Sequence, residues 1–436
     1  MSDCETIRRP QATLEDVRKI LLTQYSLTAI QVQELASYNC RNFHVKAVDG
    51  ITPTSGKTHD LDTAAFHGEP ETSATLEKLT NAGTAKETEE YILKILNNHL
   101  SSPEILEKVR QQMKCAKHLR SEGFQCPAVI NTKHGDIFAL CGVDGDEENN
   151  CHAILLKYIP GQQLGKNTSL VTPEVLVELG IFLAKLHESL KTSETKELEV
   201  CDEDLWALEN MHLLKVYLPY VQNERKRVVL LDILDKFEAV RNSEKFGCQA
   251  KGIIHGDFHD YNIIIDEASN ATRDLSETSR TVTLAFTQNL QSPSSSVQSF
   301  IKSVVEKYGI IDFEDMRNSY PALELCRLIA DLMSDCPHIE MQSIGGHVIA
   351  GYLLINAEPV RQFSFFYETI LASLAQYVVL SAYEYQAQEG ENDYLLLGSS
   401  EAWHVIQQLK NVEAKSLYGI WNSILSSYGI KDPLKI

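Results

Sequence analysis

The segment 252–266 constrains the fold of this chain most strongly. It reads Gly-Ile-Ile-His-Gly-Asp-Phe-His-Asp-Tyr-Asn-Ile-Ile-Ile-Asp, with an apolar run on each side of a polar loop. Short apolar runs of this kind are typical of buried strands, which would hold the loop between them rigidly. In that loop Asp257 offers a carboxylate, and Asn262 offers an amide oxygen five residues later. Phosphoryl transfer from a nucleotide needs a carboxylate that orients the attacking hydroxyl and an oxygen ligand for Mg²⁺. We therefore predict that Asp257 is a catalytic base and that Asn262 binds Mg²⁺.

Two further charged residues lie in apolar strand-like runs. Gly309–Phe313 ends in Asp312, which we predict to be the second Mg²⁺ ligand. Lys94 interrupts the apolar run of residues 91–96, and a buried ammonium is costly unless it meets anions such as nucleotide phosphates. A glutamate on the following helix usually holds such a lysine, and Glu107 is the best candidate, with Glu104 next.

A divalent-metal hydrolase is the competing interpretation of the same loop, because His255 and His259 are four residues apart. That spacing brings two ligands together only on a helix, whereas the Ile-rich flanks favour strand and loop. No further ligand cluster follows, and the chain has neither a P-loop motif nor Gly-x-Gly-x-x-Gly. Taken singly, each charged residue could also be a turn, a cap or a strand edge.

The charge balance bears on partners. Lys plus Arg number 40 and Asp plus Glu number 60, which gives a formal net charge of −20. An acidic chain should repel nucleic acid and anionic membranes and should favour a cationic ligand. The ten cysteines form no Cys-x-x-Cys pair, and no apolar run approaches membrane-spanning length. We expect a soluble, cytoplasmic protein with reduced thiols; the sequence does not indicate an oligomeric state.

Short strand-like runs occupy the first part of the chain and long helical patterns the rest, with the change near residue 157. This order predicts an α+β, two-lobed protein-kinase-like fold with a small mixed β-sheet N-lobe and a larger, mostly helical C-lobe. We place the nucleotide-binding lobe at residues 1–156 and the catalytic and substrate lobe at 157–436. Residues 49–88 and 269–299 are rich in small and polar residues, so we expect a loop insertion and a surface loop there.

The His-Gly-Asp-x-x-x-x-Asn segment, together with Ile-Ile-Asp-Phe at 310–313, resembles the aminoglycoside phosphotransferase and choline kinase group. Matching stretches extend over most of the chain and include Gly345–Gly351. The resemblance implies phosphorylation of the side-chain hydroxyl of 5-hydroxy-L-lysine with Mg²⁺ and with GTP as donor. The sequence itself does not distinguish guanine from adenine.

The resemblance also assigns the nucleotide contacts. The segment 37–42 would cover the phosphates, and the backbone near residues 157–159 would meet the purine. The candidate nucleotide-binding residues, besides Lys94 and Glu107, are therefore Ser37, Tyr38, Asn39, Asn42, Tyr158 and Ile159.

The implied acceptor carries two ammonium groups and a carboxylate, so its pocket should combine acidic with basic or amide groups. Candidate lining residues are Asp260, Glu314, Tyr383, Glu384 and Trp403, although helical aromatic residues more often build the core. Glu314 stands where the group usually has a glycine after Asp-Phe. Two alternatives stay open: a kinase of another small amino alcohol (aminoglycoside, choline or homoserine-like) using ATP or GTP, and a catalytically inactive nucleotide-binding module. The intact Asp257, Asn262 and Asp312 disfavour the second.

Overall fold

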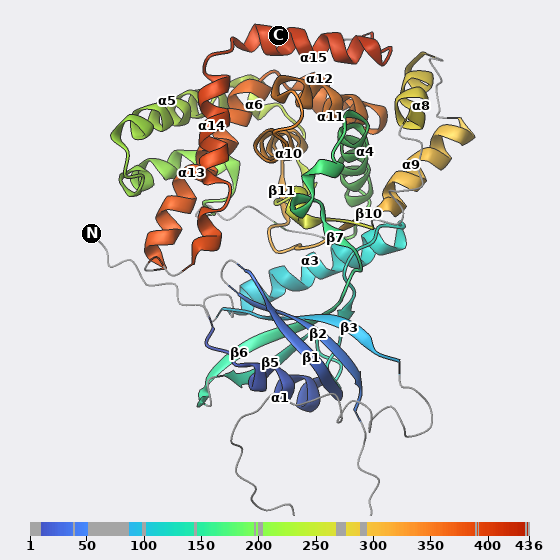
Figure 1. Cartoon of the computed structure of the whole chain (residues 1–436), viewed down its shortest axis with the longest axis vertical. Coiled ribbons are helices and arrows are strands. Elements are labelled where there is room, and N and C mark those ends of the chain that lie inside the picture. Colours follow the sequence, from blue (N-terminus) through green and yellow to red (C-terminus); the bar gives the residue numbers. More distant parts are fainter. Residues whose placement is uncertain are drawn as a thin grey trace, which may run out of the picture. The chain divides into compact units, whose positions relative to one another are not determined.

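The computed structural model (Figure 1) describes residues 10–37, 40–50, 87–97, 102–143, 146–195, 198, 204–266, 276–287, 294–388, 390, 392–431 and 434. The chain divides into two compact units. The sheet unit is formed from Arg8–Ser102 and Val129–Tyr158, and the helical unit from Pro103–Ala128 and Ile159–Ile436. An antiparallel sheet in one unit and helices in the other confirm the α+β class.

The segment 103–128 is the main difference from the expected lobe boundary, which assigns it to the first lobe. Helix α3 (Pro103–Ser121) buries Cys115, Ala116 and Leu119 in the same core cluster as the long helices. Phe124, just beyond the helix, joins that cluster. The segment therefore belongs to the helical unit because its apolar face is covered there.

The sheet unit contains one antiparallel sheet in the order β1-β2-β3-β6-β4, with β5 also paired to β6. Its strands are β1 (Leu27–Leu35), β2 (Arg41–Asp49), β3 (Glu89–Ile95), β4 (Val129–Ile130), β5 (Phe138–Val143) and β6 (Asp146–Lys157). Most of 49–88, the expected loop insertion, lies outside the described residues.

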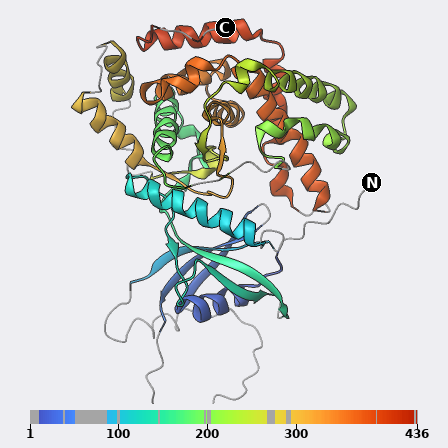
Figure 2. The same cartoon turned by 180° about the vertical axis from the view of Figure 1, so that it is seen from behind.

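Helix α1 (Leu14–Tyr25) lies against one face of this sheet in both views of the fold (Figure 1, Figure 2). Its first turn is closed by a capping box, because the Thr13 hydroxyl accepts from the Asp16 amide while Asp16 accepts from the Thr13 amide. Val17, Ile20 and Leu21 recur at helical spacing and are buried in the core of the sheet unit.

The helical unit has a single large apolar core. Its α-helices are α3, α4 (Pro173–Leu190), α5 (Glu224–Arg241), α6 (Glu244–Gly247), α8 (Ser276–Thr287), α9 (Ser295–Lys307), α10 (Pro321–Asp335), α11 (Met341–Ile355), α12 (Ala357–Gln362), α13 (Phe366–Ala387), α14 (Ser399–Leu409) and α15 (Ala414–Ser427). Short 3₁₀ segments are η2 (Leu164–Lys166), η3 (Thr168–Leu170), η4 (Leu208–Tyr220), η5 (Asp260–Asn262) and η6 (Asp393–Leu396). The small strands are β7 (Gln162–Gln163), β8 (Gly252–Ile254), β9 (Ile263–Ile265), β10 (Tyr308–Ile310) and β11 (Arg317–Ser319).

Helices α4 and α11 approach each other through two glycines. A Cβ on Gly180 would lie 2.0 Å from the carbonyl oxygen of Val348, and one on Gly351 would lie 1.9 Å from that of Val177. The missing side chains therefore let the two backbones meet directly. This contact explains two of the glycines in the helical unit by packing alone.

The prediction of a surface loop at 269–299 is wrong for the residues that the structure describes. Residues 276–287 form α8, and α9 begins at Ser295. Both helices have a buried face despite their polar composition. Thr278 donates a hydrogen bond of 2.8 Å to Glu178, and Val282 and Val297 are fully buried. Glu178 also accepts bonds from Lys307 (2.8 Å) and Tyr308 (2.9 Å), so its carboxylate joins α8 and the end of α9 to α4.

Two expectations from the sequence concern membrane-spanning helices and the cysteines. Among the described helices, none combines the length and the hydropathy that crossing a bilayer would require. The described cysteines are free thiols, and all except Cys248 are buried.

Candidate active site

The loop that carries Asp257 is held between two small sheets of the helical unit. Strand β8, which ends at Ile254, pairs with β11, and strand β9, which begins at Ile263, pairs with β10. The pairing of β9 with β10 continues past the strands, because the Ile311 amide donates to the Asn262 carbonyl at 3.0 Å. Asp312 is the next residue, so the structure brings Asp312 beside the loop of Asp257 and Asn262, as the sequence predicts.

The side chain of Asn262 stabilises the loop by hydrogen bonds to Asp257. Its amide nitrogen donates to the main-chain oxygen of Asp257 at 2.9 Å and to the Asp257 carboxylate at 2.8 Å. The Asn262 residue is 6% exposed, whereas the Asp257 side chain is 32% exposed. Because the nitrogen faces Asp257, the amide oxygen is the atom of Asn262 that is available to a cation.

His259 sits against the same carboxylate, with Nε2 3.3 Å from Asp257 Oδ2. Burial alone would raise the pKa of Asp257, but the charge and hydrogen bond of His259 outweigh it and lower that pKa below its usual range. Burial alone would lower the pKa of His259, and the carboxylate of Asp257 raises it well above its usual value. The pair thus keeps Asp257 ionised. The spacing of the motif indicates His259 only as a possible metal ligand, so this role beside Asp257 is visible only in the structure.

Asp312 has a left-handed backbone, with φ of 63°. That conformation costs a residue with a side chain about 1–2 kcal/mol, and strain of this kind clusters at functional sites. It turns the chain sharply between β10 and Phe313. A carboxylate and an amide oxygen form the kind of oxygen donor set that suits Mg²⁺, so Asp312 and Asn262 fit the predicted metal.

Glu324, near the start of α10, holds the backbone of the loop just before Asp257. Its carboxylate accepts from the His255 amide at 3.1 Å and from the Gly256 amide. His187 Nε2 lies 2.7 Å from the same carboxylate, and the Tyr352 hydroxyl bonds the other ring nitrogen at 2.8 Å. Burial would raise the pKa of Glu324, but the His187 hydrogen bond and charge lower it overall. Glu324 could have been found from the sequence, because it is an acidic residue inside the apolar run Ala322–Leu325.

Arg317 fixes the same loop from β11. Its guanidinium donates to the Gly256 carbonyl at 3.1 Å and pairs with Asp204 at 2.5 Å. Gly256 has φ of 87°, and a Cβ there would lie 2.0 Å from the Asp315 carbonyl oxygen. Only glycine fits this position, because both the backbone conformation and the space exclude a side chain.

The two histidines of the hydrolase alternative do not converge. His255 is fully buried and bonds the Ile311 carbonyl through Nε2 at 3.0 Å, whereas His259 turns to Asp257. In the described part of the chain, no group of three or more His, Cys, Asp or Glu side chains is arranged to hold a metal ion. The geometry therefore favours the kinase interpretation.

Lys94 belongs to the sheet unit, in β3, and is 8% exposed. Asn42 lies directly opposite it on β2, and the Asn42 amide oxygen is buried without a hydrogen-bond partner among the described residues. Ser37 is buried, and its hydroxyl donates to the Cys40 carbonyl at 2.6 Å. Tyr38 and Asn39 lie outside the described residues. The structure thus places Asn42 and Lys94 side by side.

The remaining nucleotide candidates have local contacts. The Tyr158 amide donates to the Glu90 carbonyl at 3.0 Å, and Ile159 begins the helical unit. Glu107, on α3 of the helical unit, accepts from Gln111 at 2.6 Å, and its side chain is 56% exposed. Its predicted pairing with Lys94 stays a prediction.

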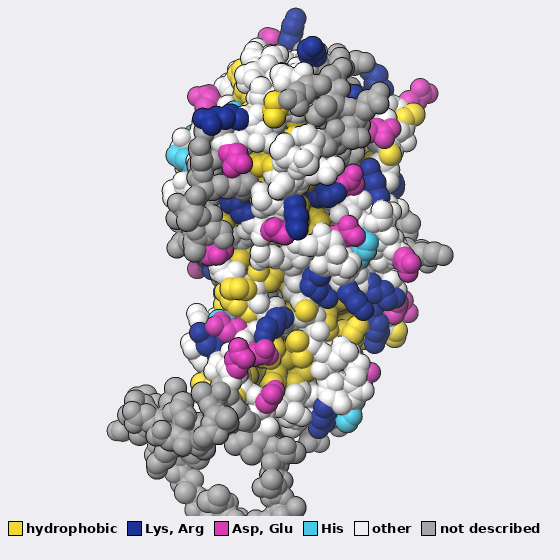
Figure 3. All heavy atoms as spheres, turned by 90° about the vertical axis from the view of Figure 1, so that its right-hand side faces the viewer, with side chains coloured by type: hydrophobic (Ala, Val, Ile, Leu, Met, Phe, Trp, Pro, Cys, Tyr) yellow, Lys and Arg dark blue, Asp and Glu magenta, His cyan; other side chains and the backbone are white. Residues whose placement is uncertain are grey.

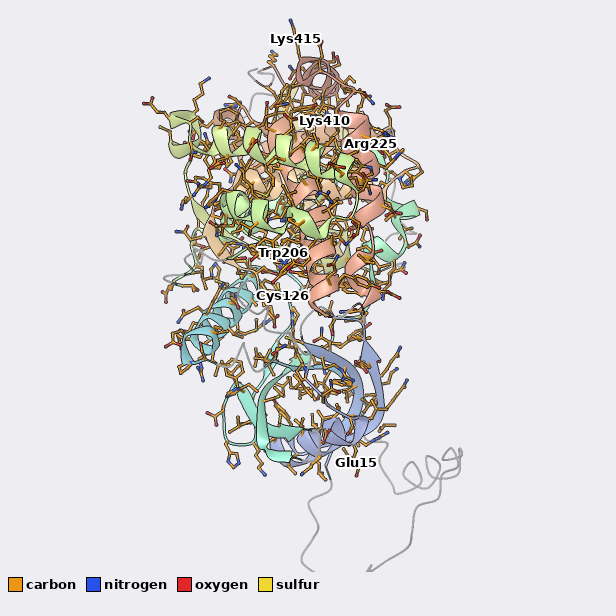
Figure 4. The ribbon with its side chains drawn as sticks, turned by 90° about the vertical axis from the view of Figure 1, so that its left-hand side faces the viewer. Glu15, Cys126, Trp206, Arg225, Lys410 and Lys415 are labelled. Carbon is orange, nitrogen blue, oxygen red and sulfur yellow. The ribbon has the colours of Figure 1, made fainter. Side chains whose placement is uncertain are left out.

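The acceptor candidates lie in different surroundings within the helical unit. Asp260 is fully buried in η5, next to the catalytic loop. Glu384 accepts from the Trp206 indole at 3.3 Å, and burial raises the pKa of Glu384 well above its usual value. Trp206, labelled in Figure 4, also lines a cavity of about 20 Å³ beside Gly256, large enough for one water.

Three other candidates contact protein groups. The Tyr383 ring packs 4.4 Å from Tyr217, the Trp403 ring lies 4.9 Å from the Lys226 ammonium, and the Glu314 carbonyl accepts from Gln112. Tyr394 of η6 was not among our candidates, although it lies within electrostatic range of Asp257, His259 and Asp312.

Comparison with known proteins agrees with this geometry. Residues 79–272 match the family model described as "Phosphotransferase enzyme family". The chain is similar to hydroxylysine kinase of Bos taurus, with 24% identity over 434 residues that cover 97% of this chain and 96% of the relative.

Solved structures share the fold. An amicoumacin kinase in complex with AMP-PNP and Ca²⁺ superposes with a TM-score of 0.55 at 12% identity, covering 92% of this chain and 93% of the other. A microcompartment-associated aminopropanol kinase superposes with a TM-score of 0.51 at 12% identity, covering 96% and 99%. The kinase-like fold predicted from the sequence is thereby confirmed.

Proposed function

We propose that this chain, a small-molecule phosphotransferase by its family match and its relatives, phosphorylates the side-chain hydroxyl of 5-hydroxy-L-lysine to 5-phosphohydroxy-L-lysine with GTP as the donor. The acceptor is taken from the hydroxylysine kinases, to which the chain is similar over nearly its whole length. A kinase of another small amino alcohol, with ATP or GTP, is the alternative, since the fold is shared with an aminopropanol kinase.

One observation carries the proposal: Asp257, Asn262 and Asp312 meet on one polar loop and the strand end beside it. Asp257 is ionised and partly exposed, so its free oxygen can accept a hydrogen bond from an acceptor hydroxyl. In that role it orients the hydroxyl toward the γ-phosphorus and takes its proton as the new O–P bond forms. The bond between the γ-phosphorus and the bridging oxygen of the β-phosphate breaks, and GDP leaves. Asn262 holds the carboxylate in place, because its amide nitrogen bonds both the side chain and the main chain of Asp257.

Asn262, through its amide oxygen, and Asp312, through its carboxylate, would hold Mg²⁺. When bound, the ion neutralises charge on the phosphate oxygens and aligns the γ-phosphoryl group for in-line transfer. The left-handed backbone of Asp312 and the bond from Ile311 to Asn262 hold both residues in position before any ligand arrives.

In the sheet unit, Lys94 and Asn42 would meet the phosphates of the donor. They are register partners on adjacent strands, so an ammonium and an amide are offered from neighbouring positions. Ser37 with the segment 37–42 would cover the phosphates, and the backbone near Tyr158 and Ile159 would meet the purine.

A substrate panel tests the proposal. The purified chain is incubated with Mg²⁺ and either GTP or ATP, and with 5-hydroxy-L-lysine, choline, 1-amino-2-propanol, homoserine or an aminoglycoside as acceptor. Release of nucleoside diphosphate and phosphorylation of the acceptor are both measured. We expect the highest kcat/KM with 5-hydroxy-L-lysine and GTP. If another amino alcohol is turned over while 5-hydroxy-L-lysine gives only the background rate, the proposed acceptor is wrong. If ATP is preferred to GTP, the proposed donor is wrong.

A further inference from the structure

We propose that Asp331 and Asp335 of α10, backed by Asp260, hold the ammonium group adjacent to the reacting hydroxyl, which makes the enzyme selective for 1,2-amino alcohols. The inference rests on the proposed kinase function and deepens it. Asp331 and Asp335 were not among the acceptor residues that the sequence suggested.

Asp260 is the first observation. Its side chain is 0% exposed, and both carboxylate oxygens are buried without a hydrogen-bond partner in the described part of the chain. Its nearest ionic contact is His259, whose Nδ1 lies 3.7 Å from Oδ1, beyond normal hydrogen-bond distance. A buried carboxylate without hydrogen bonds is unfavourable, so a cation that binds beside Asp260 would be stabilised by it.

The geometry of α10 supplies the second observation. Asp331 and Asp335 are four residues apart at the end of α10, so their side chains share one face of the helix. Helix α10 packs against η5, which contains Asp260. Both aspartates are only partly buried, so a ligand can reach them in front of Asp260.

The charges around Asp335 and Asp331 are unbalanced. Four carboxylates interact here (Asp257, Asp260, Asp331 and Asp335), and Glu401 also acts on Asp335, whereas the neighbouring cations are His259 and Arg327. Arg327 is itself engaged, since it donates to Gln376 and stacks over Trp206 at 5.8 Å. In support, burial raises the pKa of Asp331 to about 7 although Arg327 and His259 lower it, and burial followed by Asp260 raises the pKa of Asp335 to about 8. One added positive charge would reduce this excess of negative charge.

An ammonium group fits this place better than a metal ion. Among the residues that the structure describes, these carboxylates do not form a metal-holding group, whereas an ammonium needs only acceptors at about 2.7–3.2 Å in several directions. Tyr394 interacts with His259 and Asp257 and adds an aromatic ring beside the pocket.

The position selects the substrate class. In a 1,2-amino alcohol the nitrogen is two carbons from the hydroxyl oxygen, so both groups lie within hydrogen-bond reach of neighbouring carboxylates. Asp257 and Asp260 are three residues apart on one loop, which offers one acid to the hydroxyl and a second acidic pocket to the ammonium. 5-Hydroxy-L-lysine has this arrangement at its C5 hydroxyl and C6 ammonium.

Two variants and a pair of acceptors test the pocket. Asp331→Asn and Asp335→Asn are compared with wild type, and Glu277→Gln, an exposed acid on α8, is the matched control. Each protein is assayed with 5-hydroxy-L-lysine and with 2-amino-5,6-dihydroxyhexanoic acid, in which a hydroxyl replaces the side-chain ammonium. Thermal unfolding confirms that each variant is folded.

We expect the wild-type preference for the amine, as a ratio of kcat/KM, to fall about tenfold to hundredfold in either asparagine variant, as expected for losing one charged hydrogen bond. The KM for the nucleotide should not change, and Glu277→Gln should match wild type. An equal fall in kcat/KM with the amine and the diol, or no change of the preference in both variants, would contradict the proposed ammonium pocket.

The result is separable from failure of the proposed acceptor. If the panel shows another amino alcohol as substrate, the same comparison is made with 1-amino-2-propanol and 1,2-propanediol. If no acceptor is phosphorylated, calorimetric titration with 1-amino-2-propanol decides, because binding that is weakened in both variants supports the pocket and unchanged or absent binding refutes it.

Discussion

At the scale of single residues, the loop of Asp257 depends on buried charged groups from other elements. Glu324 and Arg317 grip the backbone of His255 and Gly256 from opposite elements, α10 and β11. Each is nearly fully buried, so each charge must be matched inside the protein. These positioning residues give Asp257 a fixed direction before ligands bind.

Glu324→Gln tests this support. The amide keeps the size of the side chain but loses the charge and one acceptor, which leaves the His255 or Gly256 amide without a partner. We expect the free energy of unfolding at pH 7 to fall by about 3 kcal/mol, measured by urea denaturation. We expect kcat to fall while the KM for each substrate stays nearly constant. Glu277→Gln is the control, and wild-type stability of Glu324→Gln would contradict the role.

The same variant has a defined pH dependence. The pKa of Glu324 is lower in the folded state than its unfolded value of about 4.3, so its stabilisation is present above that pH and is lost as the pH falls toward the folded pKa. The stability difference between wild type and Glu324→Gln should therefore be largest near neutrality and shrink below pH of about 4. A difference that grows in acid would contradict the lowered pKa.

At the scale of elements, close packing of α4 against α11 determines the framework behind the site. Gly180 and Gly351 each face a backbone carbonyl of the other helix. From α4, His187 reaches Glu324, so this contact and the loop support belong to one buried region.

Gly351→Ala tests the close approach. A Cβ 1.9 Å from the Val177 carbonyl must push the helices apart, and we expect a loss of about 3 kcal/mol in the free energy of unfolding. Gly419→Ala is the matched control, because it lies inside α15 with no heavy atom within 4 Å of the added Cβ. Alanine there should stabilise the protein by about 0.5–1 kcal/mol. Equal effects at both positions, measured by urea denaturation, would show that helix propensity rather than the contact matters.

The elements also show what the sequence could predict. Short apolar runs located β3, β10 and the strands around Asp257 within a few residues. The prediction from apolar runs failed at 269–299. The buried face of α8 contains Thr278 and Val282, and so few apolar residues give no clear pattern among the many Ser and Thr residues. The segment 103–128 packs with the helical unit, and chain order alone does not reveal which core covers the apolar face of α3.

The candidate site divides in the same way. Asp257, Asn262 and Asp312 were predictable because local spacing and a flanking strand fix them. Glu324, Arg317, Asp331 and Asp335 were not, since they come from other elements and carry no local motif.

At the scale of the whole molecule, the residues of the proposed site come from two units. Lys94 and Asn42 lie in the sheet unit, and Asp257, Asn262 and Asp312 lie in the helical unit. The formal net charge of −20 is not spread as a single sign, because Lys and Arg side chains occur among Asp and Glu on the face in Figure 3. Attraction of a cationic acceptor is therefore better assigned to the local acids beside Asp257 than to the net charge.

Asp257→Asn is the most direct test of the central claim that Asp257 is the catalytic base. The turnover rate is measured at saturating 5-hydroxy-L-lysine and GTP with Mg²⁺, and nucleotide affinity is measured in parallel by titration. We expect kcat to fall at least about a hundredfold, as is typical for loss of a general base, with nucleotide affinity within a fewfold of wild type. A kcat near the wild-type value in a folded, nucleotide-binding variant would contradict the claim.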